Sequence, residues 1–461
     1  MRLNIFFYLL CISSLSVAQT YDVRDYGAVN DAKTLNTKAI QKAIDECSQA
    51  GGGKVLLAGG GKFMTGTLYL KDNITLHVAN GTTLLGSPRY EDYTTDTHKN
   101  MYKNEPHMNR CLIFADGVKS IAIEGYGTID GNGHQENFKE GRPMLIRIMN
   151  SSDIHLNNIS LINPAAWTSA WLYCDNISVN GIKIISRVNN NGDGLDFDGC
   201  TNVSVTNSIF DNSDDSICLQ ASRPDRPCKN ISVSNCHFTT QWGGMRIGLL
   251  SRGNIESVTV TNCTFRNIKD SGLKIQQNEG GEMRNMVFSN LVMENVPRPI
   301  FMTFTQQRAS VDTPEGEYEP LKRMHNFMFN NIVVDNSMGD VNSAFFLTGM
   351  PNHRIEDVSL KDVQFIVAGG GTQAQADKTD LKEYTLETLK GWWPEFSKVG
   401  TLPASGIFAR HINGLHLENI SITTVNDDLR KPVVFQDVIN DSHDNLRVNG
   451  ETIQEIKVIN D

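Results

Sequence analysis

The sequence has no surplus of basic residues. Of its 461 residues, 42 are Lys or Arg and 52 are Asp or Glu, so the formal net charge is -10. Binding to a nucleic acid backbone requires a basic face, because phosphate contacts dominate the affinity. The charge balance therefore argues against nucleic acid as a partner, and a local basic patch would stand out in this acidic chain.

Metal-binding cysteine patterns are also missing. The nine cysteines include no Cys-x-x-Cys pair and no paired histidines accompany them, so the spacing is not that of a zinc site. Cys218 and Cys228 flank a Pro-containing loop and are candidates for a disulfide, but buried free thiols are an equally good alternative. We expect no bound metal and no cofactor.

The chain also has few long apolar runs, and the one at the N-terminus is typical of a signal peptide. Arg2 precedes the apolar residues 5–12, and Ser16-Val17-Ala18 forms a small-x-small cleavage site before Gln19. A membrane anchor is the alternative, but the run is too short to span a bilayer. We expect export to the periplasm or outside the cell after cleavage near Ala18, no membrane span, and a monomer built from one domain over residues 19–461.

What the sequence does contain is a weak repeat of short alternating strands. Their starts fall roughly two to three dozen residues apart in the central part, which is the spacing of a solenoid. Nearly every unit ends at Asn, Gly or Asp, residue types that tolerate a left-handed backbone, so we expect a sharp bend at the same place in each turn. The units are residues 73–78, 120–125, 153–158, 176–181, 202–207, 230–235, 257–262, 285–290, 326–331, 357–362 and 414–419.

A second strand follows each central unit and indicates the fold. Its apolar residues alternate, so one set of side chains should point inward in stacked columns. These second strands are 194–198, 215–220, 244–248, 272–276 and 299–303. The pattern predicts an all-β fold, a right-handed parallel β-helix of about ten turns, with an N-terminal capping helix over 36–49. A β-propeller is the alternative, but its hairpin turn signals are not found.

The outward positions of the second strands carry charge. In this register Asp196, Cys218, Arg246 and Lys274 share one outward column, and the next holds Asp198, Gln220, Gly248 and Gln276. Asp193, Asp214 and Asp215 come just before them, and adjacent turns lie about 4.8 Å apart. Crowded carboxylates on one groove fit glycoside hydrolysis, in which one protonates the leaving oxygen and another activates water. Calcium binding or turn capping is the alternative for these residues.

Three long insertions interrupt the repeat, at residues 90–110, 305–323 and 369–405. Loops beside a groove usually shape a binding site. The last one contains a predicted helix at about 381–389 and then Trp392-Trp393, which either stack on a sugar ring or pack the loop onto the coil.

Three segments resemble glycoside hydrolase family 28, the polygalacturonase family; they are residues 21–45, 191–200 and 213–219. The resemblance implies a right-handed parallel β-helix that hydrolyses pectic polysaccharides with inversion. It also implies that Asp214 is the general acid and that Asp193 and Asp215 activate the water. Asn191 opens the segment that matches the Asn-Thr-Asp-Gly motif, with Gly192 in place of Thr.

Two motifs of the family are altered. The family's His position is Gly243, and its Arg-Ile-Lys segment reads Lys274-Ile275-Gln276. In polygalacturonases those basic residues hold the galacturonate carboxylate. The resemblance therefore predicts a substrate-binding set of Asn191, Arg246, Lys274 and Gln276, and an acidic substrate other than plain polygalacturonan, such as a rhamnogalacturonan-type or substituted chain.

Two further functions stay open at this point. A polysaccharide lyase would use the three aspartates to hold Ca²⁺ and Lys274 or Arg246 to abstract a proton. A non-catalytic glycan-binding β-helix would also explain the altered motifs.

Overall fold

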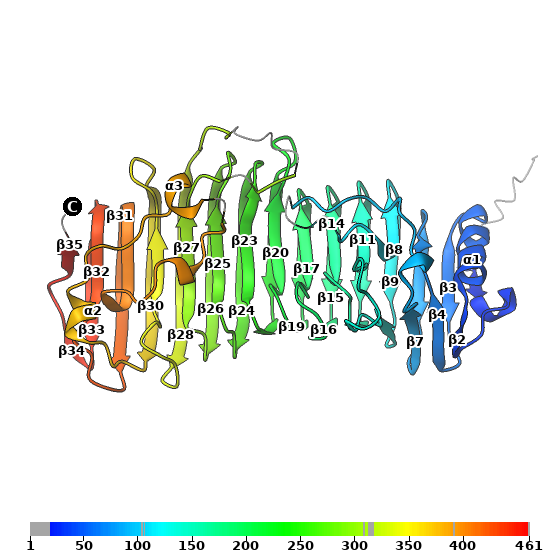
Figure 1. Ribbon diagram of the computed structural model, residues 1–461, viewed down its shortest axis with the longest axis horizontal. Helices are drawn as coiled ribbons and strands as arrows, with labels where there is room; N and C mark the ends of the chain where they lie inside the picture. Colours follow the sequence, from blue (N-terminus) through cyan, green and yellow to red (C-terminus); the bar gives the residue numbers. More distant parts are fainter. Residues whose placement is uncertain are drawn as a thin grey trace, which may run out of the picture.

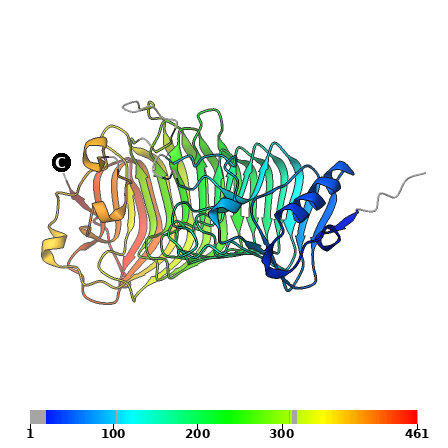
Figure 2. The ribbon, with the colours of Figure 1, turned by 45° about the vertical axis from the view of Figure 1, so that its right-hand side comes forward.

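The computed structural model describes residues 19–102, 105, 107–307, 309–311, 318–390 and 392–459, and the predicted leader at 1–18 lies outside them. The chain winds into an elongated right-handed parallel β-helix, as predicted (Figure 1). Strands stack side by side along the long axis, with α1 at one end and the C-terminal strands at the other (Figure 2).

The strands form three hydrogen-bonded ladders that run along this axis. The ladder that carries the predicted site is β5 (Leu68–Tyr69), β8 (Cys111–Asp116), β11 (Met144–Met149), β14 (Ser169–Leu172), β17 (Leu195–Asp198), β20 (Ile217–Ala221), β23 (Gly243–Ser251), β25 (Ser271–Gln277), β27 (Arg298–Phe304), β29 (Phe345–Thr348), β31 (Ala404–Thr424), β32 (Lys431–Ile439) and β35 (Lys457–Ile459).

The second ladder contains the predicted repeat units. It comprises β1 (Thr20–Asp22), β3 (Gly53–Leu57), β6 (Ile74–Val78), β9 (Lys119–Glu124), β12 (Ser152–Asn157), β15 (Asp175–Asn180), β18 (Thr201–Thr206), β21 (Cys228–Ser234), β24 (Ile255–Arg266), β26 (Met283–Glu294), β28 (Met324–Asn336), β30 (Ile355–Val367), the middle of β31, β33 (Ser442–Val448) and the antiparallel β34 (Glu451–Thr452).

The third ladder closes the coil. Its strands are β2 (Asp31–Leu35), β4 (Gly61–Thr65), β7 (Thr82–Gly86), β10 (Thr128–Asp130), β13 (Ser160–Ile162), β16 (Lys183–Ser186), β19 (Ile209–Asn212) and β22 (His237–Thr240), and it continues into the later part of β24.

Bends in left-handed backbone set the corners of the coil, as the repeat predicted. The residues that end the ten units after 73–78 have positive φ throughout, for example 53° at Asn207 and 55° at Asn235. Their side chains form a ladder: Asn207 donates to Asn180 over 2.9 Å, and Asn235 donates to Asn207 over 3.3 Å. The first residue of each unit has positive φ as well, which marks a second corner that the sequence reading did not identify.

The inward columns are confirmed. Leu195, Ile217, Met245, Leu273 and Ile300 are successive register partners, and each is fully buried. A continuous apolar core therefore fills the coil along its length, because neighbouring turns place alike side chains on top of each other.

Helices are short except for the cap. The cap α1 (Thr37–Gln49) buries Ile40, Ile44 and Cys47 against the first turns. Asn36 occupies the N-cap position, but its side chain does not cap the helix; instead it bonds to the backbone of Val29 and Met64. The other helices are α2 (Gln373–Ala376), α3 (Leu386–Leu389), η1 (Val23–Tyr26), η2 (Tyr90–Asp92) and η3 (Phe396–Lys398). The predicted helix at 381–389 is thus reduced to the single turn of α3.

The cysteines are buried and form no disulfide among the described residues. The eight cysteines among the described residues are buried free thiols, so the candidate pair Cys218 and Cys228 is not bonded. Within the described part of the chain, no helix has the length and apolar character needed to traverse a lipid bilayer.

Candidate active site

The predicted outward column exists in the structure. Asp196 on β17, Cys218 on β20, Arg246 on β23 and Lys274 on β25 are register partners on successive turns. The next column is interrupted, because β23 shifts register between the partners of Leu219 and Ala221 and displaces Gly248 from Gln220. The coil therefore presents one continuous row of polar side chains on this face.

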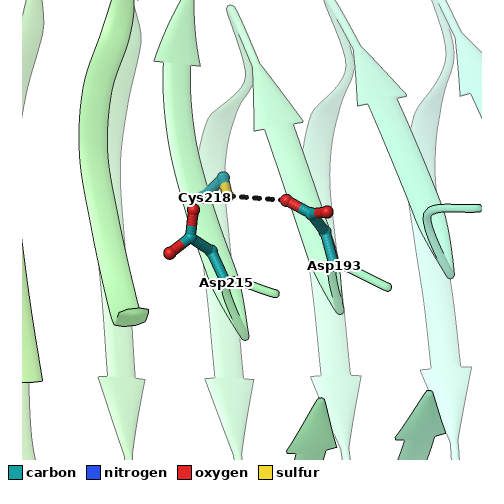
Figure 3. Close-up of side chains that lie close together, drawn as sticks. All are labelled: Asp193, Asp215 and Cys218. Atoms are coloured by element: carbon teal, nitrogen blue, oxygen red, sulfur yellow. Dashed lines mark hydrogen bonds between the residues drawn. The ribbon is translucent and has the colours of Figure 1, made fainter. Parts of the chain in front are cut away.

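Three aspartates gather at the start of that row. Asp193 and Asp215 precede β17 and β20 on neighbouring turns. Both carboxyls lie beside Cys218, whose Sγ is 3.8 Å from Oδ2 of Asp193 (Figure 3). Asp193 is 3% exposed and Asp215 is fully buried, whereas Asp214 keeps a fifth of its side chain exposed. The stacking of consecutive turns thus brings together carboxylates that are 21 and 22 residues apart in the sequence.

Asp215 is held by two donors. Its Oδ1 accepts from the backbone N–H of Gly243 over 2.9 Å, and its Oδ2 accepts from the guanidinium of Arg246. The same guanidinium lies 3.9 Å from Oδ1 of Asp214 and donates to the hydroxyl of Tyr102 over 3.3 Å. A paired guanidinium and a backbone N–H favour the ionised form of a carboxylate, so these two contacts favour the charged form of Asp215.

The other two carboxyls are harder to ionise. Burial raises the pKa of Asp193 well above its ordinary value, and the neighbouring carboxyls of Asp214 and Asp196 add to the rise. Burial also raises the pKa of Asp214, although the charges of Arg246 and Lys274 hold it back. Because like charges this close resist ionising together, a proton is available in the trio at a pH where free carboxylic acids are ionised.

A pocket of about 150 Å³ opens onto these groups. Asp193 and Asp214 line it, so both carboxyls can reach a bound molecule. The full lining is Tyr102, Glu105, Trp167, Asn191, Asp193, Asp214, Trp242, Arg246, Trp393 and Glu395. Aromatic rings with a few polar groups are the usual lining of a sugar site.

Asn191, one of the predicted substrate-binding residues, lies in the pocket wall. Its Oδ1 accepts from Arg142 over 2.7 Å, and its Nδ2 is 3.5 Å from Oε1 of Glu105. Arg142 also donates to the carbonyl of Asn190 over 2.7 Å. These contacts fix the loop before Asp193 in place.

The structure puts Lys274 and Gln276 elsewhere. Both side chains are fully buried and neither lines the pocket. Nζ of Lys274 lies 2.6 Å from Oε2 of Glu395 and 3.0 Å from Oδ2 of Asp270, and Gln276 donates to the carbonyl of Pro394 over 3.0 Å. The insertion at 369–405 therefore covers both side chains. The spacing of residues in the sequence does not predict this contact.

Two insertions meet over the pocket, and they bring Trp393, which the sequence singled out, and Tyr102, which it did not. Tyr102, from the insertion at 90–110, packs edge-on against Trp167 at 5.6 Å and against Trp393 at 6.2 Å between ring centroids. Trp393 thus lines the pocket, while its neighbour Trp392 is 65% exposed and contacts Lys398. For Tyr102 the length of its insertion was the one available signal.

The insertion at 90–110 also covers the outer face of earlier turns. Met101 and Met108 pack with Ala170 and Leu172 of β14, and the buried Arg147 of β11 donates to the carbonyls of Thr97, His98 and Met108. The row of polar side chains is thereby roofed on its N-terminal side.

A divalent-cation site is a weak fit to these residues. Asp193, Asp215 and Cys218 can bring three ligand atoms within 4.8 Å of one another. However, Ca²⁺ takes oxygen ligands, and one of the three atoms is a thiol sulfur. The carboxylate of Asp215 is already paired with Arg246, which disfavours the arrangement that a Ca²⁺-dependent lyase needs.

Comparison with known proteins gives a consistent result. The model of the family described as "Glycosyl hydrolases family 28" matches residues 56–384. A "Probable polygalacturonase" of Vitis vinifera is 25% identical over 429 residues, covering 85% of this chain and 84% of that protein. An "Exo-poly-alpha-D-galacturonosidase" of Dickeya chrysanthemi is 26% identical over 403 residues, covering 73% of this chain and 65% of that protein.

Solved structures share the fold. The family 28 exopolygalacturonase of Yersinia enterocolitica superposes with a TM-score of 0.72 at 24% identity, covering 92% of this chain and 78% of that one. The polygalacturonase of Erwinia carotovora ssp. carotovora gives a TM-score of 0.56 at 18% identity, covering 97% and 98%.

Proposed function

Since the chain belongs to the glycosyl hydrolases of family 28 and is an inverting glycoside hydrolase, we propose that it cleaves pectin-like acidic polysaccharides at the Asp193, Asp214 and Asp215 trio. The observation that carries this proposal is the pocket onto which Asp193 and Asp214 both open, with Asp215 paired to Arg246 behind them. The lyase alternative is not favoured.

Each carboxyl then has a role. Asp214 gives its proton to the glycosidic oxygen as the bond from that oxygen to the anomeric carbon breaks. A water molecule attacks the anomeric carbon from the opposite face and passes a proton to the carboxylate pair of Asp193 and Asp215. Asp214 suits the acid role because burial raises its pKa and it keeps an exposed edge in the pocket. Asp215 suits the base role because Arg246 favours its charge.

The contact between Tyr102 and Trp393 supports action at a chain end. Their rings close over the pocket from two insertions, and the N-terminal side of the groove is covered by the packing of Met101 and Met108. A long polysaccharide would have to thread beneath this roof, whereas a chain end can enter from the open side. We therefore propose exo action, the activity named for the relatives from Dickeya and Yersinia.

The mature protein is proposed to be exported as one catalytic domain over residues 19–461 that acts as a monomer. Its acidic character suits no nucleic acid partner.

Incubation with pectic oligosaccharides, including galacturonan and rhamnogalacturonan fragments, tests the function, with products separated by size and their ultraviolet absorbance recorded. We expect saturated products and early release of monosaccharide. An unsaturated, absorbing product that disappears with a chelator would establish a lyase instead. Trp393→Ala should add longer products by opening the roof, while the exposed neighbour Trp392→Ala should leave the product sizes unchanged.

A further inference from the structure

The contact between Lys274 and Glu395 leads to an inference about which sugars the pocket accepts. Lys274 stands one turn after Arg246 in the outward row, where a cation would be placed to hold a substrate carboxylate. Its Nζ is instead 2.6 Å from Oε2 of Glu395, which is 121 residues further along the chain. The place next to Lys274 is thus already filled by a carboxylate of the protein itself.

The segment that brings Glu395 is firmly seated. Pro394 accepts from the buried side chain of Gln276 over 3.0 Å, and the carbonyl of Glu395 accepts from the hydroxyl of Tyr384 over 2.6 Å. Lys274 is fully buried, with Asp270 as a second partner at 3.0 Å and the Trp242 ring centroid at 4.7 Å. A substrate cannot reach this ammonium group without displacing the segment.

The charges that remain in the pocket favour an uncharged sugar. Of the residues described as its lining, four carry carboxyl groups, namely Glu105, Asp193, Asp214 and Glu395, and one is a cation, Arg246. That cation is already paired with Asp215. A second carboxylate, brought by a uronate beside Glu395, would meet like charge in a partly desolvated site, which weakens binding. A sugar hydroxyl can instead donate to the carboxylate of Glu395 and stack on Trp393.

We propose that Glu395 is a specificity-determining residue that selects an uncharged sugar unit on its side of the cleaved bond. This inference rests on the proposed function and specifies it further: the bond that is cleaved joins a uronate to an uncharged unit. Two chemical sources share this property, a neutral sugar and a uronate whose carboxyl is methyl-esterified.

A set of matched oligosaccharides tests the proposal. The unit on one side of the cleaved bond is a free galacturonate, its methyl ester or galactose, and each side is varied in turn. On one side, we expect kcat/KM to be at least about tenfold higher with an uncharged unit than with the free acid, a difference equivalent to about 1.4 kcal/mol. Comparison of the methyl ester with galactose shows whether the enzyme prefers an esterified uronate or a neutral sugar.

Glu395→Gln provides the decisive variant, since its amide oxygen can still accept from Lys274 while its negative charge is gone. We expect the preference for the uncharged unit to fall about tenfold or more, because free uronate is no longer repelled. The exposed Glu387→Gln of the same insertion is the matched control and should keep the wild-type preference. An unchanged preference in Glu395→Gln, or a wild-type protein that cleaves the fully ionised compounds at least as fast, would overturn the proposal.

Calorimetric binding of the same compounds to Asp214→Asn separates this inference from the proposed function. Absence of hydrolysis of every compound by the wild type would contradict the proposed function. The charge preference would still be read from the affinities, and tighter binding of the ionised compounds would contradict the role of Glu395.

Discussion

The backbone N–H of Gly243 donates a hydrogen bond of 2.9 Å to Oδ1 of Asp215, and this close approach leaves no space for a side chain at position 243. A Cβ at this position would collide with the same oxygen. Gly243, which stands where the family has His, therefore lets Asp215 contact the backbone directly.

Restoring the histidine is expected to harm the enzyme. Gly243→His would push Asp215 away from its N–H donor and from Arg246, and a displacement of about 1 Å in a catalytic group can lower the rate about 100-fold. Measurement of kcat on pectic oligosaccharides checks this, with circular dichroism to confirm folding. A variant with higher activity than the wild type would contradict this account, because it would show that the site can accept the histidine and benefits from it.

The register of the coil was predictable because it depends on local rules. Alternating apolar residues fix which face of a strand points inward, and Asn or Gly residues mark the bends. From these rules the sequence placed Leu195 under Ile217 and Asp196 beside Cys218, and both pairings are found. The meeting of Asp193 and Asp215 follows directly from that register.

The side-chain contacts of Lys274 and Gln276 could not be predicted from such local rules. The predicted pairing of Lys274 with Arg246 and of Gln276 with Gly248 was right. Their side-chain partners, Glu395 and Pro394, come from an insertion without repeat periodicity. Nothing in the local sequence states where such a loop will pack, because its course is set by contacts far apart in the chain. The same holds for Tyr102 over the pocket.

The pH dependence of activity should be displaced upward. Asp214 must keep its proton and the base must lose one, and burial raises the pKa of Asp214 and of Asp193 above the ordinary 3.8. Activity should therefore fall as the pH rises past the raised pKa of Asp214, because the acid then loses its proton. This alkaline limb of kcat/KM should lie above pH 3.8.

Replacement of Arg246 tests the direction in which these electrostatic interactions shift the pH profile of activity. Its charge lowers the pKa of both Asp193 and Asp214, so the pH profile of Arg246→Gln should move to higher pH, with lower overall activity. Arg252→Gln, which loses an ion pair with Glu319 outside the pocket, should leave the profile in place. A shift of the Arg246→Gln profile to lower pH would contradict the electrostatic explanation.

A buried carboxyl next to the site should make stability depend on pH. Burial raises the pKa of Asp198 from 3.8 to about 6, even though its Oδ1 accepts from the backbone N–H of Ser222. Because the folded state holds the proton more tightly than the unfolded state, the free energy of unfolding should fall as the pH rises from about 4 to about 6.

Asp198→Asn tests this dependence, since its amide oxygen can keep the bond to Ser222. The variant should remove this contribution and be more stable than the wild type above pH 6 by on the order of 3 kcal/mol. Denaturant unfolding at several pH values measures the difference. Equal slopes in the wild type and the variant would show that Asp198 is ionised without cost.

The asparagine ladder should contribute to stability through its backbone conformation. Asn207 has a φ of 53° and hydrogen bonds to Asn180 and from Asn235. Asn207→Ala should lower the free energy of unfolding by about 1–2 kcal/mol, because Ala disfavours the left-handed region. Asn207→Gly, which tolerates that region, should cost less than Asn207→Ala. Equal losses would assign the effect to the side-chain hydrogen bonds alone.

Turnover by Asp214→Asn tests the central claim most directly. An asparagine cannot donate a carboxyl proton to the leaving oxygen, so kcat on a pectic oligosaccharide should drop by about 100-fold to 10,000-fold while binding persists. The exposed Asp225→Asn is the matched control and should retain wild-type kcat. Unchanged turnover by Asp214→Asn would contradict the assignment of Asp214 as the acid and, with it, the proposed mechanism.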